Sequence, residues 1–335
     1  TTLINFFAKR INRLLPAIIV LCIISIIVGY FILLPEEMNF LAHTIKSSLI
    51  FNSNNFFYFN TNYFSEVSNS PILHTWTLGL EFQFYIFIIV FAIFFKSHTK
   101  YWLILAIFFS ICLAQFGGNL KFERPFIEDN IKFFSPLYGS FFLFPTRLFE
   151  FLIGVFFLIN FDKIKYLKKF RFLDYLSVFI IIISTVYFNK YTPHPSLYTL
   201  ILCISVAYLL ITTGNNKSYI ERILFFKPLY SFGLLTYGFY IWHYIIIFFY
   251  KTYFGANLLL EDRLLLLIYS LIATYISFYF LEKPMSSNKT TLIKKSFFYL
   301  ISVVMLISAI FFVEKTNGFS SRLDFKNLIK LKSFD

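Results

Sequence analysis

Charged residues are scarce in this chain. Only 14% of its 335 residues are Asp, Glu, Lys or Arg, whereas a soluble domain carries roughly 25%. Hydrophobic residues make up 58%, and several apolar runs approach the roughly 20 residues that cross a bilayer as a helix. This composition excludes a soluble globular domain and predicts an integral membrane protein. Because alternating barrel strands are absent, and lipid permits little else, we expect the spans to be helices.

Cysteine is also scarce. Cys22, Cys112 and Cys203 all lie within apolar runs and lack the spacing of metal ligands or of a disulfide framework. We interpret them as small buried residues, and we expect no bound metal or cofactor. The sequence also lacks a Gly-rich phosphate loop and a Gly-x-Ser-x-Gly nucleophile elbow. No acyl-serine mechanism is therefore expected.

The net charge of +13 does not indicate a nucleic-acid partner. The basic residues gather in short loops on one side of the predicted spans, where they set membrane topology. These loops are 9–13, 96–100, 163–171, 217–227 and 283–295. The positive-inside rule then predicts a cytoplasmic N-terminus and an external C-terminus.

The predicted fold is an all-α polytopic transmembrane bundle in contact with the lipid bilayer. About nine spans can be placed from the apolar runs: 14–34, 76–95, 101–116, 141–159, 173–188, 196–212, 231–250, 263–281 and 297–313. The longest connections, 35–73 and 117–140, are predicted to lie outside and to shape a substrate entrance.

One predicted helix carries an unusual polar stripe. Residues 71–87 place His74, Thr77, Glu81 and Tyr85 near one face of an otherwise apolar segment. Polar groups are costly in lipid, so such a stripe is a functional-site hypothesis. A histidine beside a carboxylate suits general-base chemistry. His74 alone is equally well explained as a histidine at the membrane interface. Seven residues rise about 10 Å, so His74 and Glu81 would cooperate only through substrate, water or another helix.

Four further clusters carry polar groups. Arg10 and Arg13 flank the inner end of the first span, as a positive-inside anchor or as a clamp for phosphates. Arg147 and Glu150 are three residues apart and can form an ion pair, either structural or part of a site. The third cluster is an aromatic stretch with Thr236, Tyr240 and His243, which is either an aromatic belt at the membrane interface or part of a site. The fourth is Glu282, which we expect to be solvated at the end of a helix that Pro284 terminates.

Together, these blocks resemble the acyltransferase-3 family of bacterial membrane O-acyltransferases. The most specific block is His-x-Trp-[Ser/Thr]-Leu-x-x-Glu-x-x-Phe/Tyr. The matching residues are His74, Trp76, Thr77, Leu78, Glu81 and Phe84-Tyr85; Arg10, Arg13 and Pro16; Tyr237, Tyr240, Trp242 and His243; and Glu282 with Pro284. The resemblance runs from about Phe6 to Pro284.

The resemblance implies transfer of an acyl group, usually acetyl, from cytoplasmic acyl-CoA to a sugar hydroxyl of an envelope glycan. Typical acceptors are lipopolysaccharide O-antigen, other surface polysaccharides and peptidoglycan, and the expected location is the bacterial inner membrane. It assigns catalytic roles to His74, Glu81, Arg147, Glu150 and His243. It assigns binding of the coenzyme A phosphates to Arg10 and Arg13, and substrate contacts to Trp76, Tyr85, Tyr237 and Tyr240.

The resemblance also implies a domain plan. Residues 1–284 correspond to the membrane domain without its first two helices, the first of which carries a histidine regarded as catalytic. Residues 285–313 form an additional helix, and 314–335 begin an external link towards an SGNH-hydrolase-like domain. The missing helices and that domain are the expected protein partners, and no nucleic acid is expected.

Two alternatives remain open from the sequence. A transporter or flippase for a lipid-linked glycan would line its pathway with the same buried charges, although no inverted repeat is visible. An inactive fragment of a longer acyltransferase is the second alternative.

Overall fold

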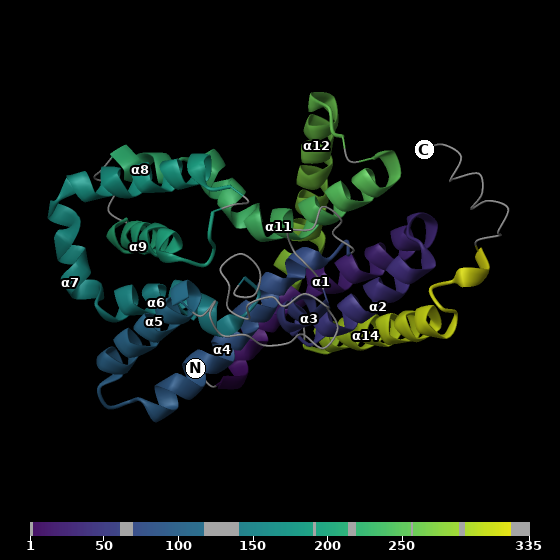
Figure 1. Ribbon diagram of the computed structural model, residues 1–335, viewed down its shortest axis with the longest axis horizontal. Helices are drawn as coiled ribbons and strands as arrows, with labels where there is room; N and C mark the ends of the chain where they lie inside the picture. Colours follow the sequence, from purple (N-terminus) through teal and green to yellow (C-terminus); the bar gives the residue numbers. More distant parts are fainter. Residues whose placement is uncertain are drawn as a thin grey trace. The chain divides into compact units, whose positions relative to one another are not determined.

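The computed structural model describes residues 3–60, 70–116, 141–189, 192–213, 219–255, 257–287 and 292–322. Within these ranges the secondary structure is helical and no strand forms, which confirms the all-α fold (Figure 1). Six helical segments of the described chain are long and apolar enough to cross a membrane: Asn5–Ile32, Leu73–Phe94, Thr99–Phe116, Lys227–Phe254, Leu260–Ser286 and Ile293–Lys315. The protein is accordingly a multi-pass membrane protein.

The other three predicted spans form shorter helices. Helices α6 (Phe144–Ile159) and α9 (Leu197–Thr212) have 16 residues each, and α8 (Arg171–Tyr187) has 17. At 1.5 Å per residue they rise about 24–26 Å, less than the roughly 30 Å of a hydrocarbon core. The number of nine spans is therefore not confirmed. The predicted loop 117–140 lies outside the described residues, as does the tail beyond Arg322.

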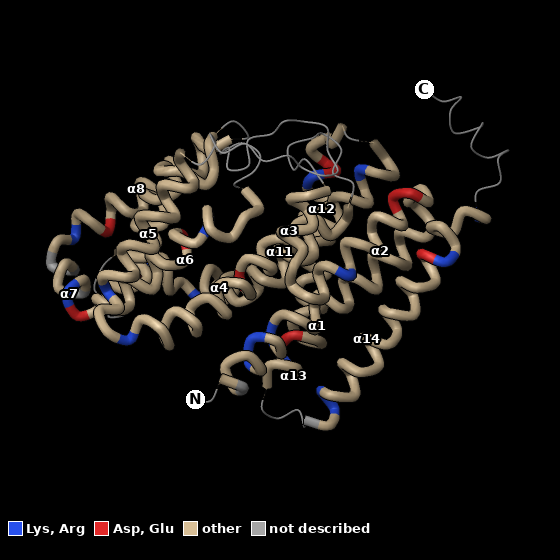
Figure 2. The backbone as a smooth tube through the Cα atoms, turned by 60° about the horizontal axis from the view of Figure 1, so that its bottom comes forward, with Lys and Arg blue, Asp and Glu red and all other residues tan. Residues whose placement is uncertain are grey.

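The chain divides into two compact units, which we describe separately. The first unit comprises the described parts of Thr1–Ile50, Ser68–Thr75 and Gly233–Asp335. In it α1 (Leu3–Ile32) packs against α2 (Pro35–Leu49) and α14 (Leu292–Lys315), and α14 also packs against α2 (Figures 1 and 2). All three helices carry buried aliphatic side chains, among them Ile18, Leu21, Leu41, Ile45 and Ile310.

The predicted external loop 35–73 is largely helical, which corrects the expectation. It contains α2 and α3 (Ser53–Asn60), followed by a 3₁₀ turn at Leu73–Thr75. Pro35 occupies the start of α2, and Glu37 accepts a hydrogen bond from the backbone N–H of Leu34 at 2.9 Å. Proline followed by acidic residues is a helix-start signal. The apolar pattern of α2 is short and interrupted by polar residues, so it does not predict the face of this helix that packs on α1 and α14.

The segment after α14 folds back onto the end of α1. Arg322 donates hydrogen bonds to the carbonyls of Tyr30 and Leu33, where α1 ends. Gly318 has φ +70°, and a Cβ there would lie 2.0 Å from the Pro35 carbonyl oxygen. Only glycine fits that approach. Residues 316–322, predicted as the start of a link, are thus fixed to the first unit.

Helix α12 does not end where the sequence predicted. Leu260–Ser277 continues through a π-helical turn, Phe278–Glu282, into α13 (Lys283–Ser286). Pro284 therefore lies within a helical segment. The wider π turn explains this, because it changes the hydrogen-bond register just before the proline ring. The same turn carries Glu282, and π turns often coincide with functional sites.

The second unit comprises the described parts of Phe51–Val67 and Trp76–Phe232. Its helices form a layered stack in which α5 (Thr99–Phe116) packs on α6, α6 on α9, and α9 on α8. Helix α4 (Trp76–Phe94) contacts both α3 and α6. The short helices α7 (Phe161–Lys165) and α10 (Tyr219–Leu224) complete the unit, and α11 (Lys227–Phe254) begins in it.

The core of the second unit fixes the position of α6. Phe149 and Leu152 are fully buried on this helix, against Leu103 and Ala114 of α5. The Ser110 hydroxyl donates to the carbonyl of Pro145 at 2.6 Å and accepts from the Phe149 N–H at 2.9 Å. The start of α6, which carries Arg147 and Glu150, is thereby held by both apolar packing and polar contacts.

Candidate functional site

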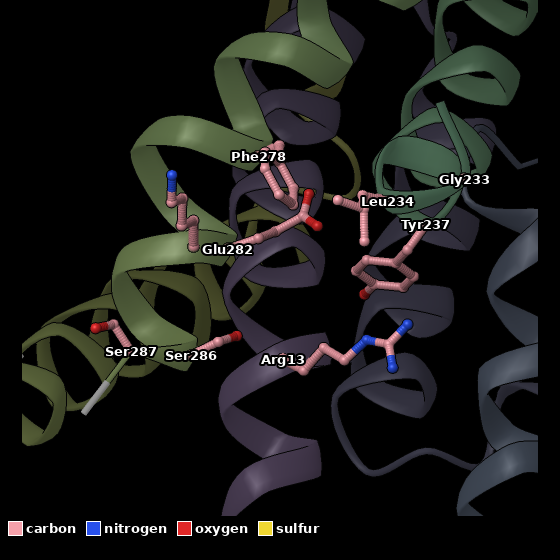
Figure 3. A pocket seen from close by; sticks show the side chains of 9 residues that line it. Arg13, Gly233, Leu234, Tyr237, Phe278, Glu282, Ser286 and Ser287 are labelled. Atoms are coloured by element: carbon pink, nitrogen blue, oxygen red, sulfur yellow. The ribbon is translucent and has the colours of Figure 1, made fainter. Parts of the chain in front are cut away.

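The first unit contains a cavity of about 500 Å³ between the ends of several helices (Figure 3). Its lining combines an arginine, a carboxylate, a tyrosine and two serines: Arg13, Gly233, Leu234, Tyr237, Phe278, Glu282, Lys283, Ser286 and Ser287. Arg13 comes from α1, Tyr237 from α11 and Glu282 from the π turn. Three of the five clusters singled out in the sequence therefore meet at one cavity.

Arg13 supplies a cation that interacts with the Glu282 carboxylate only at longer range. Among the described residues, no acceptor or carboxylate lies within hydrogen-bond or ion-pair distance of its guanidinium. Such a group is available to an incoming anion. Arg10 differs, because its guanidinium carbon lies 3.5 Å from the centre of the Phe6 ring and Nη1 donates to the Phe6 carbonyl at 3.3 Å. Of the two predicted phosphate ligands, only Arg13 lines the cavity.

Glu282 is buried rather than solvated, which corrects the sequence interpretation. Its side chain is 6% exposed, and it accepts a hydrogen bond from the Ser277 hydroxyl at 3.0 Å. Gly238 of α11 allows this placement, because a Cβ there would lie 2.9 Å from Glu282 Oε1 and 3.2 Å from Thr274 Cγ2. Helices α11 and α12 are thus in close contact where the carboxylate enters the cavity.

Tyr237 links the cavity to the first helix. Its hydroxyl donates to the carbonyl of Leu14 at 2.7 Å, one residue after Arg13. Lys283 lies on the opposite wall, with its ammonium 5.1 Å from the centre of the Tyr279 ring. Figure 3 shows Tyr237, Glu282 and Arg13 projecting towards the same space. The cavity is therefore lined by a guanidinium, an ammonium, a carboxylate and several hydroxyls.

A second cluster in the first unit brings two predicted histidines together. The ring of His74 lies 5.4 Å from that of Tyr240, 6.3 Å from His243 and 4.9 Å from Tyr244, measured between ring centres. The Tyr240 hydroxyl donates to the His74 carbonyl. His74 is 5% exposed, whereas His243 is half-buried. His74 and His243, to which the resemblance assigns catalytic roles, are thus neighbours, and Tyr244, which the sequence analysis did not single out, lies beside them.

His243 has a defined tautomer. Its Nδ1 lies 2.9 Å from the carbonyl oxygen of Phe239, one turn earlier on α11. Because a carbonyl only accepts hydrogen bonds, Nδ1 carries a hydrogen, and in the neutral ring the lone pair therefore lies on Nε2. A neutral imidazole with a fixed Nδ1–H and a free Nε2 is the arrangement of a general base.

The predicted polar stripe is divided. His74 lies in the 3₁₀ turn Leu73–Thr75, and the α-helix begins only at Trp76. The heptad argument that placed His74 on the face of Glu81 assumed an α-helix that already includes His74, so their shared face stays a prediction. Glu81 and Tyr85, one turn apart on α4, do interact, and the Tyr85 hydroxyl donates to Glu81 Oε1.

Gln83 on α4 belongs to a structural amide pair. Its Nε2 donates to Asn54 Oδ1 at 2.9 Å, and Asn54 Nδ2 donates to the carbonyl of Phe142 at 3.1 Å. A Cβ on Gly79 would lie 2.5 Å from Asn54 Oδ1. On α4, Gly79 and Gln83 thus serve the packing of α3, whereas Glu81 and Tyr85 pair with each other.

Arg147 of α6 lies in a buried network within the second unit. Nη1 lies 3.0 Å from Glu150 Oε2 and 2.6 Å from His194 Nε2, and Nε donates to the carbonyl of Phe141 at 3.1 Å. The guanidinium carbon lies 5.0 Å from the centre of the Trp76 ring and 4.7 Å from that of Phe141. The predicted Arg147–Glu150 pair is confirmed, and Trp76 contacts its cation.

His194 was missed by sequence reasoning. It lies in the connection between α8 and α9, 47 residues from Arg147. Burial and the adjacent Arg147 charge lower the pKa of His194 from 6.5 to about 3. The only sequence signal is a lone histidine between two predicted spans, which does not identify its partner.

No group of three His, Cys, Asp or Glu side chains that could hold a metal ion occurs in the described ranges. The roles assigned to individual residues, and the expectation that no cofactor is bound, stay predictions.

Comparison with known proteins supports the resemblance. The model of the acyltransferase domain family, acyltransferase-3, matches residues 1–282. The peptidoglycan O-acetyltransferase OatA of Listeria monocytogenes is 27% identical over 305 residues, covering 85% of this chain and 46% of OatA. The O-acetyltransferase OatA of Staphylococcus aureus (strain NCTC 8325) is 25% identical over 296 residues, covering 84% of this chain and 47% of that protein.

A third relative, YrhL of Bacillus subtilis, is 28% identical over 306 residues, covering 84% of this chain and 45% of YrhL. The chain thus spans about half the length of these curated relatives. No solved structure matches it. The family match covers most of the chain and includes all the blocks described above except Pro284, so this chain belongs to the acyltransferase-3 family.

Proposed function

We propose that this protein is a membrane O-acetyltransferase that moves an acetyl group from acetyl-CoA to a hydroxyl of a bacterial envelope glycan. The observation that carries the proposal is the family match over residues 1–282, which includes every cluster at the Arg13 cavity. The similarity to the peptidoglycan O-acetyltransferase of Listeria monocytogenes favours peptidoglycan as the acceptor over lipopolysaccharide O-antigen.

The Arg13 cavity is the proposed donor site. Its volume of about 500 Å³ suits part of a large ligand, and the Arg13 guanidinium has no partner among the described residues. Guanidinium groups bind phosphates through paired N–H donors. Glu282 would exclude phosphate from its own side of the cavity by charge repulsion, which would direct the phosphates of the donor towards Arg13.

The proposed chemistry is direct transfer between thioester and hydroxyl. The acceptor oxygen attacks the carbonyl carbon of the acetyl thioester, the carbon–sulfur bond breaks, and the coenzyme A thiolate leaves. A histidine removes the hydroxyl proton and returns it to the thiolate. We assign that role to His243, because the Phe239 carbonyl binds its Nδ1–H and so leaves Nε2 as the nitrogen that can take up the proton. The inner-membrane location and the cytoplasmic N-terminus are part of the same proposal.

The test uses membranes that contain the expressed protein, with radiolabelled acetyl-CoA. We expect label in the glycan fraction, and separation of peptidoglycan from lipopolysaccharide identifies the acceptor. Arg13→Ala should raise the KM for acetyl-CoA about 10- to 100-fold, the loss expected for a charge-assisted contact. Arg263→Ala, at an exposed position on α12, is the matched control.

A binding measurement makes the donor site testable without turnover. The purified protein in detergent should bind coenzyme A, and Arg13→Ala should weaken that binding while Arg263→Ala does not. Equal binding by wild type, Arg13→Ala and Arg263→Ala would show that this cavity is not the donor site. Glycan movement across the membrane without acetyl-CoA would instead support a transporter.

A further inference from the structure

The Arg147 network contains more than an ion pair. One Arg147 nitrogen, Nη1, faces both Glu150 Oε2 and His194 Nε2. A guanidinium Nη carries two hydrogens and no lone pair, so one hydrogen is directed to each partner. Arg147 Nε is also bound, to the Phe141 carbonyl. The cation is 6% exposed and is thus fixed by three acceptors on two sides.

This geometry defines the protonation state of His194. Because Arg147 can only donate, His194 Nε2 must accept, and its hydrogen then resides on Nδ1. An imidazolium would place a second cation 2.6 Å from the guanidinium, which opposes protonation. The lowered pKa of His194 agrees with this geometry. The residue is therefore a neutral acceptor at physiological pH, and its Nε2 cannot also act as a base.

The connection that carries His194 is held in place by its own contacts. The Ser196 hydroxyl donates to the carbonyl of Pro193 at 2.7 Å and caps the start of α9 by accepting from the Tyr198 N–H at 3.2 Å. The His194 ring lies 5.9 Å from the centre of the Phe141 ring. These contacts fix the imidazole relative to α9 and, through Phe141, to the start of α6.

We propose that His194 is a positioning residue for acyl transfer, which holds Arg147 through its Nε2 lone pair and so keeps the Arg147–Glu150 pair in one orientation. The inference rests on the proposed function. Glu150 is the more exposed member of the pair, with 18% of its side chain accessible against 7% for Arg147. A carboxylate with spare lone pairs accepts hydroxyl protons, so the hydroxyl-bearing acceptor is the substrate that this pair would orient.

Three variants and a control test the proposal by kinetics. His194→Gln keeps an acceptor near the position of Nε2, whereas His194→Ala removes it and His194→Lys replaces it with a donor. His98→Ala is the control, because His98 is exposed in the connection between α4 and α5. We expect His194→Ala and His194→Lys to lower kcat/KM for the glycan acceptor about 10- to 100-fold. His194→Gln should stay within about threefold, and the KM for acetyl-CoA should be unchanged in all variants.

The pH dependence of unfolding tests the neutral state independently of activity. His194 has a folded pKa of about 3, below its unfolded value of 6.5. Below pH 6.5 the unfolded chain therefore binds a proton that the folded protein does not, and stability falls as the pH falls. Among the described residues, the charged group that faces this imidazole is Arg147 of α6, and Arg147 and its partner Glu150 both remain in His194→Gln. The melting temperature of wild type should drop more between pH 7.5 and 5.5 than that of His194→Gln.

The outcomes separate the two proposals. Equal acceptor kcat/KM in wild type and His194→Ala would overturn the positioning role. Equal pH dependence of melting in wild type and His194→Gln would overturn the neutral acceptor, and with it the proposal. Absence of any acetyl transfer in wild type would contradict the proposed function, while the melting comparison would still decide the state of His194.

Discussion

Two arginines, one in each unit, occupy opposite electrostatic situations. Arg13 lines a cavity of about 500 Å³ and has no bonded partner among the described residues. Arg147 is 6% exposed and bonded to a carboxylate, an imidazole and a carbonyl. The first cation is available to a ligand, whereas the second is committed to the protein.

The difference shows why a charge in a membrane protein cannot be interpreted from its sequence position alone. Both arginines lie near predicted span ends, and both fall within residues 1–282, which match the family. A free arginine contributes binding energy only when an anion arrives. A buried pair contributes little net stability, but removal of one partner leaves an uncompensated charge.

The largest expected effect comes from breaking the closed network. Glu150→Ala should lower the free energy of unfolding by about 3–5 kcal/mol, because Arg147 would remain buried without its counter-ion. Arg13→Met should change it far less, by about 1 kcal/mol at most, since Arg13 forms no hydrogen bond or ion pair with the described residues and its charge acts on Glu282 only from a distance. Denaturant titration in mixed micelles measures both values.

The double variant Arg147→Met/Glu150→Met provides the control for this prediction. With both charges removed, the cost should fall well below that of Glu150→Ala alone. An equal or larger loss would mean that the two residues act through packing against Trp76 and Phe141 rather than through charge.

The sequence predicted the features that depend on residues close together in the chain. Apolar runs placed helices at all nine predicted positions, and the three-residue spacing of Arg147 and Glu150 gave the correct pair. These features depend on periodicity within one helix. The helix start at Pro35 was also marked locally, yet it was overlooked because the segment is too short and mixed for a span.

The non-local features could not be obtained in the same way. His194 meets Arg147 across 47 residues, and Asn54 meets Gln83 across 29. A single sequence carries no record of which distant polar groups pair after packing. The division of the stripe at Trp76 and the burial of Glu282 likewise follow from a 3₁₀ turn and a π turn. Such turns depend on tertiary contacts more than on residue pattern.

An intermediate effect on the free energy of unfolding is expected at Gly238, where α11 packs closely against α12 beside the Arg13 cavity. Gly238→Ala would place a Cβ 2.9 Å from Glu282 Oε1 and 3.2 Å from Thr274 Cγ2. We expect a loss of about 1–3 kcal/mol in unfolding free energy, as for overpacked cores. Gly233→Ala on the same helix meets nothing within 4 Å and should instead gain up to about 1 kcal/mol. A stabilised Gly238→Ala would show that Glu282 is free to move and that the cavity is not fixed by this contact.

Among the charge pairs, the smallest effect is expected at one whose two side chains are exposed to water. Lys46 of α2 lies 2.5 Å from Glu314 of α14, with side chains 49% and 31% exposed. Lys46→Met should cost no more than about 1 kcal/mol, because water solvates both charges and His43 also lies 3.8 Å from Glu314. The effect should fall further in high salt, since exposed charges are screened. A loss as large as that of Glu150→Ala would show that pairing itself, and not burial, distinguishes Arg147 from Arg13, because the exposed and buried pairs would then contribute equally.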